Sequence, residues 1–350
     1  MIRRFALSLA VVAVAIVVTP LKGLTTHGTP AAPRIVAVGD VHGSFDNFVA
    51  ILTRAGLIDA QRNWTGGNTV LVQTGDTTDR GPGVRKIFDL LMALEKQAAS
   101  AGGRVQVILG NHEMMNLVSD LRDVAPEAFE SFGGEAPYRE AFSKDGRYGK
   151  WLRSKPIIAE IDDTVFLHGG LDLEFSKDSI NDLNRRAQKE IVDWDAGMRF
   201  MLEKKLIDST ARFAAIVTAA RAEIERLNAL FEAKDKNLPS DAPRTVTLLL
   251  PIANIPASSL FHAQGPLWFR GFATWSDAEG KERMDALLKH YRVKRFVTGH
   301  TVQREGRINP RFGGALFLID TGMLDGKFFP NGRPSALEIL PDATNPIYVE

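Results

Sequence analysis

Polar residues of the types that bind divalent cations follow several short apolar runs of this sequence. Each of these runs gives way directly to glycine and to aspartate, asparagine or histidine. Carboxylates, neutral imidazoles and amide oxygens are the ligands that such cations take when they converge from rigid supports. The residues that supply this set are Asp40, His42, Asp76, Asn111, His168 and His300.

The same set is large enough for two cations. Two-metal sites hold their ions about 3.5–4 Å apart, and a bridging carboxylate then binds both. Asp76 is the natural candidate for the bridge because it follows a strand in the middle of the series, whereas Asp40 and His42 can bind one ion from a single loop. The candidates for the other ion are Asn111, His168 and His300.

Each cluster also has an ordinary structural explanation. A Gly-Asp pair after a strand often forms a turn, Asn-His-Glu at 111–113 could cap a helix, and His-Gly-Gly at 168–170 could be a tight turn. Their joint occurrence argues against these explanations, because four of the seven histidines follow separate apolar runs with glycine adjacent or one residue away. Glycine at such points lets the backbone approach a ligand closely.

The apolar runs predict short β-strands, and the intervals at 46–55 and 84–99 carry apolar residues at helical spacing. Alternating strands and helices predict a layered α/β sandwich. Ligands of α/β sheets bind beyond the carboxyl ends of the strands, so polar residues far apart in the sequence can meet there. The predicted strands span residues 34–38, 69–73, 104–109, 164–167, 295–298 and 316–319.

A helical insertion at about 174–240 interrupts this alternation. Apolar residues recur every three or four positions in two long runs, and Asp208 or Ser209 is placed to cap the second. We interpret the pair as a helical cap packed by its own apolar stripe, the alternative being a pair of cofactor-binding helices. The segment 239–243 breaks the pattern, and 245–250 is expected to form an edge strand.

Composition excludes several other kinds of site. The 350 residues are 45% hydrophobic and 24% charged, which is ordinary globular usage and excludes wholesale disorder. The absence of cysteine rules out disulfides, thiolate catalysis, zinc–thiolate sites and iron–sulfur clusters. Lys and Arg number 43 against 42 Asp and Glu, and this balance, a net charge of +1, predicts no nucleic-acid partner.

Residues 1–33 form a separate segment. Arg3 and Arg4 precede an apolar run at 5–18, which is shorter than the roughly 20 residues of a membrane span and suits a signal peptide better. We expect an exported protein, periplasmic or extracytoplasmic, whose first segment is a signal peptide or an N-terminal membrane anchor followed by a linker. The functional domain is then expected to span 34–350.

Five motifs resemble, in order, those of the calcineurin-like metallophosphoesterases. Asp-Arg-Gly at 79–81 and Asn-His-Glu at 111–113 resemble the phosphoprotein phosphatase branch, and segment 265–271 resembles the bacterial-like (Shewanella-like) protein phosphatases. Thr77-Thr78 departs from the aliphatic pair of the eukaryotic serine/threonine enzymes, which leaves the preference for protein substrates open. The five motifs are Gly39-Asp40-Val41-His42-Gly43, Gly75-Asp76-Thr77-Thr78-Asp79-Arg80-Gly81, Gly110-Asn111-His112-Glu113, His168-Gly169-Gly170 and Gly299-His300.

This resemblance implies a layered β-sandwich flanked by helices, with the helical insertion as a cap. It also implies a cofactor of two divalent metal ions, either Mn²⁺ or an Fe/Zn-type pair. The implied ligands are Asp40, His42 and Asp76 for one ion and Asp76, Asn111, His168 and His300 for the other, with Asn111 also facing the substrate.

The resemblance further implies that His112 is the general acid for the leaving oxygen, that Asp79 orients it, and that Arg80 contacts the phosphate. Elementary chemistry agrees. Two divalent ions lower the pKa of a bridging water for in-line attack on phosphorus. An imidazole held by a carboxylate can protonate the leaving group near neutral pH, and a guanidinium binds phosphoryl oxygens as a fork. Arg270 is a second candidate for phosphate binding, the alternative being an arginine at the edge of the core, and Glu113 is expected to support the metal ligands.

Three functions are compatible with these motifs. The first is a phosphomonoesterase that acts on phosphoproteins, at serine and threonine or at tyrosine. The second is a hydrolase of small phosphoesters or of dinucleoside polyphosphates. The third, an inactive metal-binding scaffold, is disfavoured because no metal-ligand or acid position has been lost from the motifs.

Overall fold

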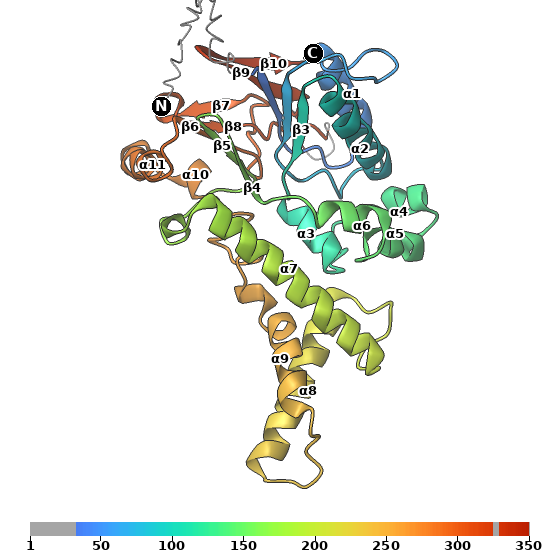
Figure 1. Ribbon diagram of the computed structural model, residues 1–350. Helices are drawn as coiled ribbons and strands as arrows, with labels where there is room; N and C mark the ends of the chain where they lie inside the picture. The colour runs from blue at the N-terminus through green and yellow to red at the C-terminus, as the bar shows by residue number, and fades with distance from the viewer. Residues whose placement is uncertain (1–32, 325–328, 350) are drawn as a thin grey trace, which may run out of the picture. The chain divides into compact units, whose positions relative to one another are not determined.

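Two five-stranded mixed sheets pack against each other in this protein (Figure 1). The computed structural model describes residues 33–324 and 329–349. The strand orders are β10-β9-β1-β2-β3 and β4-β5-β6-β8-β7. The first sheet contains β1 Ile35–Val38, β2 Val70–Gln73, β3 Arg104–Val107, β9 Ser335–Leu340 and β10 Ala343–Tyr348. The second contains β4 Ile158–Ile161, β5 Thr164–Leu167, β6 Arg295–Thr298, β7 Asn309–Arg311 and β8 Leu316–Leu318.

All six strands predicted from the apolar runs are present, as β1, β2, β3, β5, β6 and β8. They form the two parallel cores, β1-β2-β3 and β5-β6-β8. Their register aligns the carboxyl ends, since Val38 lies opposite Gln73 and Leu167 lies opposite Thr298. The polar residues that follow these strands therefore emerge along one edge of each sheet.

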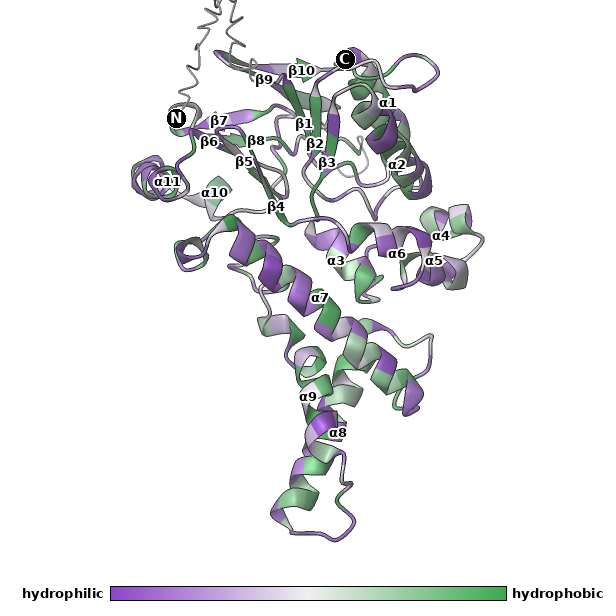
Figure 2. Ribbon diagram, viewed as in Figure 1, coloured by the Kyte–Doolittle hydropathy of each residue, from purple (hydrophilic) through white to green (hydrophobic). Residues whose placement is uncertain are grey.

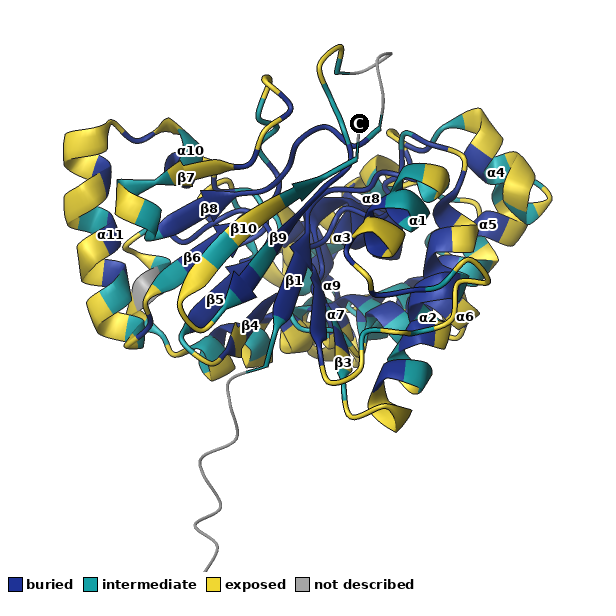
Figure 3. Ribbon diagram, turned by 90° about the horizontal axis from the view of Figure 1, so that it is seen from above, coloured by how far each residue is buried: buried dark blue, intermediate teal, exposed yellow. Residues whose placement is uncertain are grey.

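The apolar core lies between the sheets and on their outer faces. Ala37 and Val72 of the first sheet share one apolar cluster with Phe166 and Val297 of the second. Helices α1 Phe45–Arg54 and α2 Val84–Ser100 cover the first sheet, and α11 Asp277–Tyr291 covers the second. Figure 3 shows the resulting layers, with strands such as β1, β5 and β8 buried in the middle, β10 exposed or half-buried, and exposed residues on the outer sides of the helices. The predicted α/β sandwich is confirmed.

Short helices connect these layers near the ends of the strands. They pack through aromatic rings, for example Phe88 of α2 against Tyr148, whose ring centroids lie 5.4 Å apart. The short α-helices are α3 Asn111–Leu117, α4 Pro126–Phe132, α5 Glu135–Phe142, α6 Arg147–Leu152 and α10 Gly271–Thr274. The 3₁₀ turns are Phe175–Lys177, Ile255–Ala257 and Phe312–Gly314.

The inserted region contains three helices, α7 Ile180–Glu203, α8 Phe213–Glu232 and α9 Ala242–Ala253. The two predicted helices are confirmed as α7 and α8. The predicted edge strand at 245–250 is wrong, because this segment lies within α9 and buries Thr245, Leu249 and Ile252 at helical spacing. Figure 2 shows apolar and polar residues alternating along these helices, as expected of amphipathic elements.

The predicted cap of α8 is also wrong. Helix α8 begins after Arg212, three or four residues beyond the predicted cap. Asp208 instead accepts a hydrogen bond from the backbone N–H of Thr210 at 2.8 Å and closes a local turn. Serine caps are present on α7, where Ser179 Oγ accepts from Asp182 N at 3.1 Å, and on α11, where Ser276 Oγ accepts from Glu279 N at 3.3 Å.

The predicted N-terminal segment, including the apolar run at 5–18, lies outside the described residues, apart from position 33. Among the helices that the structure describes, none has the length and apolar character needed to cross a membrane.

Candidate active site

The ligand candidates predicted from the sequence all lie just beyond the carboxyl ends of parallel strands. Asp40 and His42 follow β1, Asp76 follows β2, and Asn111 begins α3 beyond β3. The remaining two candidates are His168 after β5 and His300 after β6. All six side chains belong to buried residues, none more than 7% exposed. Both sheets thus contribute to one buried polar cluster.

Asp76 is the centre of this cluster. Its Oδ2 lies 3.2 Å from His168 Nε2, 3.6 Å from His42 Nε2 and 3.8 Å from His112 Nε2. Asn111 Oδ1 lies 2.9 Å from His168 Nε2. Two groups have ligand atoms close enough for one ion each, namely His42, Asp76 and His112, and Asp76, His168 and His300. Asp76 belongs to both groups, which is the position that a bridging ligand requires.

Asp40 joins the cluster through the backbone of a neighbouring loop. Its carboxylate accepts from His300 N at 2.9 and 3.2 Å, and its Oδ2 lies 3.8 Å from His42 Nε2. The loops after β1 and β6 are therefore tied together at the cluster, although their residues are far apart in the sequence.

Backbone carbonyls orient three of the histidines. His42 Nδ1 lies 2.9 Å from Thr78 O, and His168 Nδ1 lies 3.0 Å from Thr74 O. His300 Nε2 lies 3.1 Å from the carbonyl of Trp268. A carbonyl can only accept, so in the neutral ring each of these nitrogens carries the proton, and the other nitrogen keeps its lone pair for a ligand.

The loops hold unusual backbone conformations that close approach requires. His42, Asp76 and His300 adopt positive φ angles of 45°, 55° and 66°. Gly75 has φ 99°, and a Cβ there would lie 2.5 Å from Gly110 N and 2.9 Å from His168 Nδ1. Strained residues of this kind concentrate at functional sites, where the surrounding structure maintains them.

Glu113 is buried below these loops and holds them together. The sequence suggested only a supporting role for this residue, but its carboxylate accepts six hydrogen bonds. The donors are the N–H groups of Asp76, Thr77, Thr78 and Gly110 and the hydroxyls of Thr77 and Thr78, at 2.7–3.2 Å. The threonine pair that departs from the family pattern thus supplies four of these six donors, two of which are hydroxyls that an aliphatic pair would lack. The sequence signal for Glu113 was its place three residues after Gly110, as in a helix capping box.

The electrostatics of the cluster favour bound cations. Burial raises the pKa of Asp40 well above its usual value, and the negative charges of Asp320 and Asp76 raise it further. Burial also acts to raise the pKa of Asp76, but the charges of His168 and His112 outweigh it and hold the pKa well below its usual value. Several buried carboxylates in one place need positive charge to stay ionised together. The oxygen and nitrogen donors present fit divalent cations, which supply that charge.

His112 lies beside the cluster and is held by Asp79. Its Nδ1 lies 2.7 Å from Asp79 Oδ2. Burial alone would lower the pKa of His112, but the charge of Asp76 and the hydrogen bond to Asp79 raise it to about 9. The Nε2 atom also lies 3.2 Å from Arg80 Nη2, a contact that can exist as a hydrogen bond only with the neutral imidazole. Asp79 therefore fixes the orientation of His112, and the raised pKa favours the protonated imidazole, in which Nε2 no longer accepts from Arg80.

Two arginines face the cluster. Arg80 donates through Nη1 to His42 Nε2 at 2.8 Å, so a metal ion on that nitrogen would take the place of the guanidinium. Arg270 Nη1 donates to His300 O at 3.0 Å and to Thr301 Oγ1 at 3.1 Å. Within the described residues neither guanidinium forms an ion pair with a carboxylate. Both keep positive charge available for an anionic group.

Asn116 and Tyr138 extend the His112–Asp79 pair, and neither residue was predicted from the sequence. Asn116 Nδ2 donates to Asp79 Oδ1 at 2.8 Å, and Tyr138 Oη donates to Asn116 Oδ1 at 2.7 Å. The available signal was the spacing of four between His112 and Asn116, which places both on one face of α3. Tyr138 comes from α5 and has no such local signal.

We expect Asn116→Ala to lower the rate with alkyl phosphoesters about fivefold, the effect of roughly one hydrogen bond. Without Asn116, Asp79 loses one of its two donors and holds His112 less firmly. The measurement is the ratio of kcat for an alkyl ester to kcat for p-nitrophenyl phosphate, since loss of acid catalysis should affect the alkyl ester more. Tyr138→Phe should shift this ratio less, because Asn116 keeps its bond to Asp79. A uniform slowing of both substrates would contradict this positioning role.

Comparison with known proteins agrees with this geometry. Residues 33–219, more than half of the chain, match the family model of the calcineurin-like phosphoesterases. The chain belongs to the calcineurin-like phosphoesterase family. As a member of this family it is a metal-dependent phosphoesterase, as its five motifs predict.

Individual members of the family align over most of the chain. An uncharacterized protein of Schizosaccharomyces pombe is 32% identical, over 83% of this chain and 74% of its own length. Shewanella-like protein phosphatase 1 of Plasmodium berghei is 30% identical, over 83% of this chain and 67% of its own length. The crystal structure of a cold-active protein-tyrosine phosphatase of a Shewanella species superposes with a TM-score of 0.63 at 25% identity, covering 91% of this chain and 81% of that one. The resemblance to Shewanella-like phosphatases is thereby confirmed.

Proposed function

We infer that the protein is a dinuclear-metal phosphomonoesterase that removes phosphate from phosphorylated proteins. One observation carries this proposal, namely the donor cluster around Asp76 with the His112–Asp79 pair directly beside it. The names of the relatives support protein substrates, since one is a protein phosphatase and another is a protein-tyrosine phosphatase.

In this proposal Asp40, His42 and Asp76 hold one divalent ion, and Asp76 is shared with the second. The further ligands of the second ion are Asn111, His168 and His300. Two such ions lower the pKa of a water molecule toward neutrality and offset the charge of the phosphate. The choice between Mn²⁺ and an Fe/Zn-type pair requires metal analysis of the protein from its native host, because oxygen and nitrogen ligands suit both.

The remaining residues bind the phosphate and supply the proton. Arg80 and Arg270 bring guanidinium groups without carboxylate partners to the cluster, where they bind phosphoryl oxygens in a bidentate fashion. His112 Nε2 donates its proton to the leaving oxygen, and Asp79 stabilises the imidazolium before transfer and fixes its orientation. Burial of the cluster excludes bulk water from these contacts.

We expect the purified protein to hydrolyse p-nitrophenyl phosphate only when a divalent metal is present. After exhaustive chelation the rate should fall to background, and added Mn²⁺ should restore it, because the proposed nucleophile is a water molecule whose pKa only the bound metal ions lower toward neutrality. Activity that survives chelation would overturn the two-metal mechanism. A panel of phosphoserine, phosphothreonine and phosphotyrosine peptides, with nucleotides and sugar phosphates beside them, then tests the substrate class.

Export of the protein is a separate proposal that depends on residues 1–33. We expect these residues, fused to a reporter enzyme that is active only outside the cytoplasm, to carry it across the membrane, because the paired arginines and the apolar run at 5–18 suit an export signal. A fusion in which the run is interrupted by two lysines is the control. Reporter activity confined to the cytoplasm with the natural segment would refute export.

A further inference from the structure

A cavity of about 760 Å³ borders the candidate active site, between the second sheet and the start of α8. Its inner wall is shared with the donor cluster, since Trp268 provides the carbonyl for His300 Nε2 and Arg270 donates to His300 O. Its outer wall contains Arg122, Phe213 and Phe261, for which no hydrogen bond to the donor cluster exists among the described residues. The cavity thus lies next to the donor cluster, to which Trp268 and Arg270 connect it through His300.

The outer wall adjoins the loop that contacts His112 and Arg80. The loop that carries Arg122 also places Asp123 Oδ2 4.0 Å from His112 Nδ1, and Asp123 O accepts from Arg80 N at 3.1 Å. His112 protonates the oxygen that remains with the dephosphorylated product. Because Arg122 is next to Asp123 and lines the cavity, the cavity offers room beside His112 for the part of the substrate beyond that oxygen.

Three aromatic rings form a continuous wall of this cavity, which we call the aromatic wall: Phe213, Phe261 and Trp268. The ring centroids of Phe213 and Phe261 lie 5.7 Å apart at 19°, and those of Phe261 and Trp268 lie 6.3 Å apart at 35°. All three rings are half-buried, so each packs on one side and leaves part of its surface to the cavity. Trp268 is fixed by a hydrogen bond from Nε1 to Leu260 O at 2.9 Å. A rigid apolar surface of this kind binds apolar side chains at little entropic cost.

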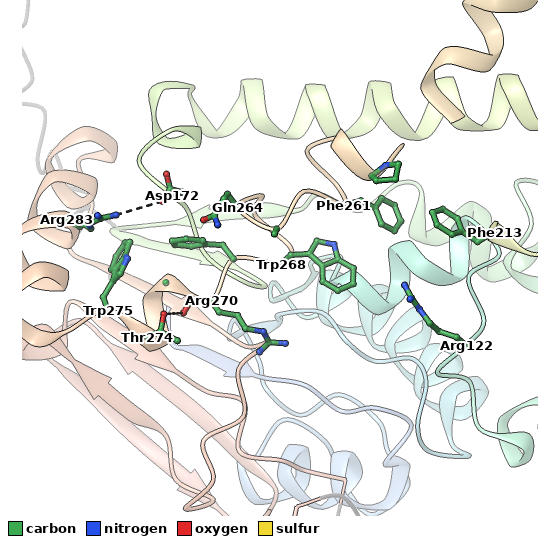
Figure 4. Close-up of a pocket in the computed structure, with 14 residues that line it drawn as sticks. Arg122, Asp172, Phe213, Phe261, Gln264, Trp268, Arg270, Thr274, Trp275 and Arg283 are labelled. Atoms are coloured by element: carbon green, nitrogen blue, oxygen red, sulfur yellow. Dashed lines mark hydrogen bonds and ion pairs between the residues drawn. The ribbon is translucent and has the colours of Figure 1, made fainter. Parts of the chain in front are cut away.

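The charges around the cavity are mainly positive. Three arginines and one aspartate line it, and that aspartate, Asp172, lies 3.9 Å from Arg283. Arg122 pairs with Asp120 at 2.7 Å, but its own side chain remains 65% exposed. In Figure 4 the ring of Trp268 lies between Arg270 and Arg122, with Phe261 and Phe213 beyond it. The cavity therefore combines an apolar wall with a basic rim, and its volume suits a ligand larger than one side chain.

We propose that this cavity is a substrate subsite for the peptide segment next to the phosphorylated residue. An apolar side chain of that segment packs on the aromatic wall, and an acidic side chain pairs with Arg122. This inference rests on the proposed protein phosphatase function and specifies the sequence that the enzyme prefers around its target. The insertion takes part directly, because Phe213 is the first residue of α8.

The test uses three phosphopeptides of equal length with the same phosphorylated residue and a leucine in the flank. They differ only in whether the other flanking residues are glutamate, glutamine or lysine, and p-nitrophenyl phosphate serves as the substrate without a flank. In the natural enzyme kcat/KM should follow the order glutamate, glutamine, lysine, mainly through KM. In Arg122→Glu the ratio of kcat/KM for the glutamate peptide to that for the lysine peptide should fall about tenfold, because an exposed attraction becomes a repulsion.

Two matched control variants separate the subsite from general effects. Arg147→Glu changes an arginine that is 61% exposed and pairs with Asp89 at 2.9 Å, much as Arg122 pairs with Asp120, but it does not line the cavity. The ratio between the peptides should stay unchanged in this variant. Phe213→Ala should lower kcat/KM for leucine-containing peptides relative to glycine-containing ones about fivefold, whereas Phe231→Ala, on the same helix and 70% exposed, should not.

The outcomes distinguish this inference from the proposed function. If phosphopeptides are hydrolysed but Arg122→Glu leaves the ratio between the glutamate and lysine peptides unchanged, the subsite is wrong and the protein phosphatase function stands. If p-nitrophenyl phosphate is hydrolysed and no phosphopeptide is, both proposals are overturned. A tenfold fall in Arg122→Glu, with no change in Arg147→Glu, supports the subsite.

Discussion

Replacing His112 by alanine is expected to slow the hydrolysis of alkyl phosphoesters by about 10²–10⁴-fold, the usual range for loss of a general acid. Alkoxide leaving groups need a proton, and His112 is the imidazole that Asp79 holds at 2.7 Å beside the donor cluster. The deficit should shrink markedly with p-nitrophenyl phosphate, because p-nitrophenolate leaves without protonation. The measurement is kcat for a series of esters with leaving groups of increasing pKa.

The geometry makes this experiment decisive, because His112 Nε2 also lies close enough to Asp76 and His42 to share an ion with them. His168→Ala is the comparison, since His168 Nε2 lies 3.2 Å from Asp76 Oδ2 and its loss should weaken metal binding. Excess Mn²⁺ should then recover part of the rate of His168→Ala and none of the loss in His112→Ala. If His112→Ala loses metal, or slows every ester equally, His112 is a ligand or a phosphate contact and another group is the acid.

Asp79→Asn should give a milder form of the same dependence on the leaving group. The amide can still occupy the place of the carboxylate, but it does not stabilise the imidazolium of His112 by charge. Asp79 has two partners, since Oδ2 lies against His112 Nδ1 and Oδ1 accepts from Asn116 Nδ2. An asparagine side chain has only one carbonyl oxygen, so it can accept from only one of these two donors. Its effect should therefore fall between those of Asn116→Ala and His112→Ala.

The sequence was sufficient to predict the parallel strands and the cluster that follows them, and the reason is physical. A buried parallel strand is apolar on both faces, so runs such as 35–38 and 70–73 stand out from their surroundings. The residues after such strands converge because the register aligns the strand ends. Local sequence patterns were therefore enough to predict that the ligand candidates meet at the ends of these strands.

Other elements depend on contacts that no local pattern records. Strand β10 is mostly exposed or half-buried and includes Pro346, so it lacks the apolar character of the parallel strands and is defined by its pairing with β9. Helix α9 contains the segment Thr245-Val246-Thr247, whose β-branched residues favour a strand, but burial against α7 and α8 determines the helix. In the site, the role of Asn116 arises from the contact of α3 with Asp79 in the loop after β2, and that of Tyr138 arises only when α5 packs against α3.

The contacts of Glu113 with the loop after β2 are also absent from any local sequence pattern. Its replacement has the largest effect on stability that we expect. Replacing it by alanine should lower the free energy of unfolding by about 4 kcal/mol, because six donors lose their acceptor and each unsatisfied buried donor costs about 1–3 kcal/mol before relaxation or entry of water. The donors come from the loop after β2 and from the start of α3. The loss should therefore also displace Asp76 and weaken metal binding. The measurement is urea unfolding of the metal-free and metal-loaded forms, together with a metal titration.

Glu113→Gln separates shape from charge, since it fills the same space. One oxygen of Glu113 accepts from Thr77 and Thr78, and the other accepts from the N–H groups of Asp76 and Gly110. The amide nitrogen of glutamine can replace neither oxygen without facing backbone N–H donors. Glu113→Gln should therefore remain clearly destabilised.

Glu127→Ala, a control at an exposed glutamate in the first turn of α4, should change stability by no more than about 0.5 kcal/mol. If Glu113→Ala instead unfolds within about 1 kcal/mol of the natural protein, water replaces the carboxylate and Glu113 is not what fixes the loop of Asp76.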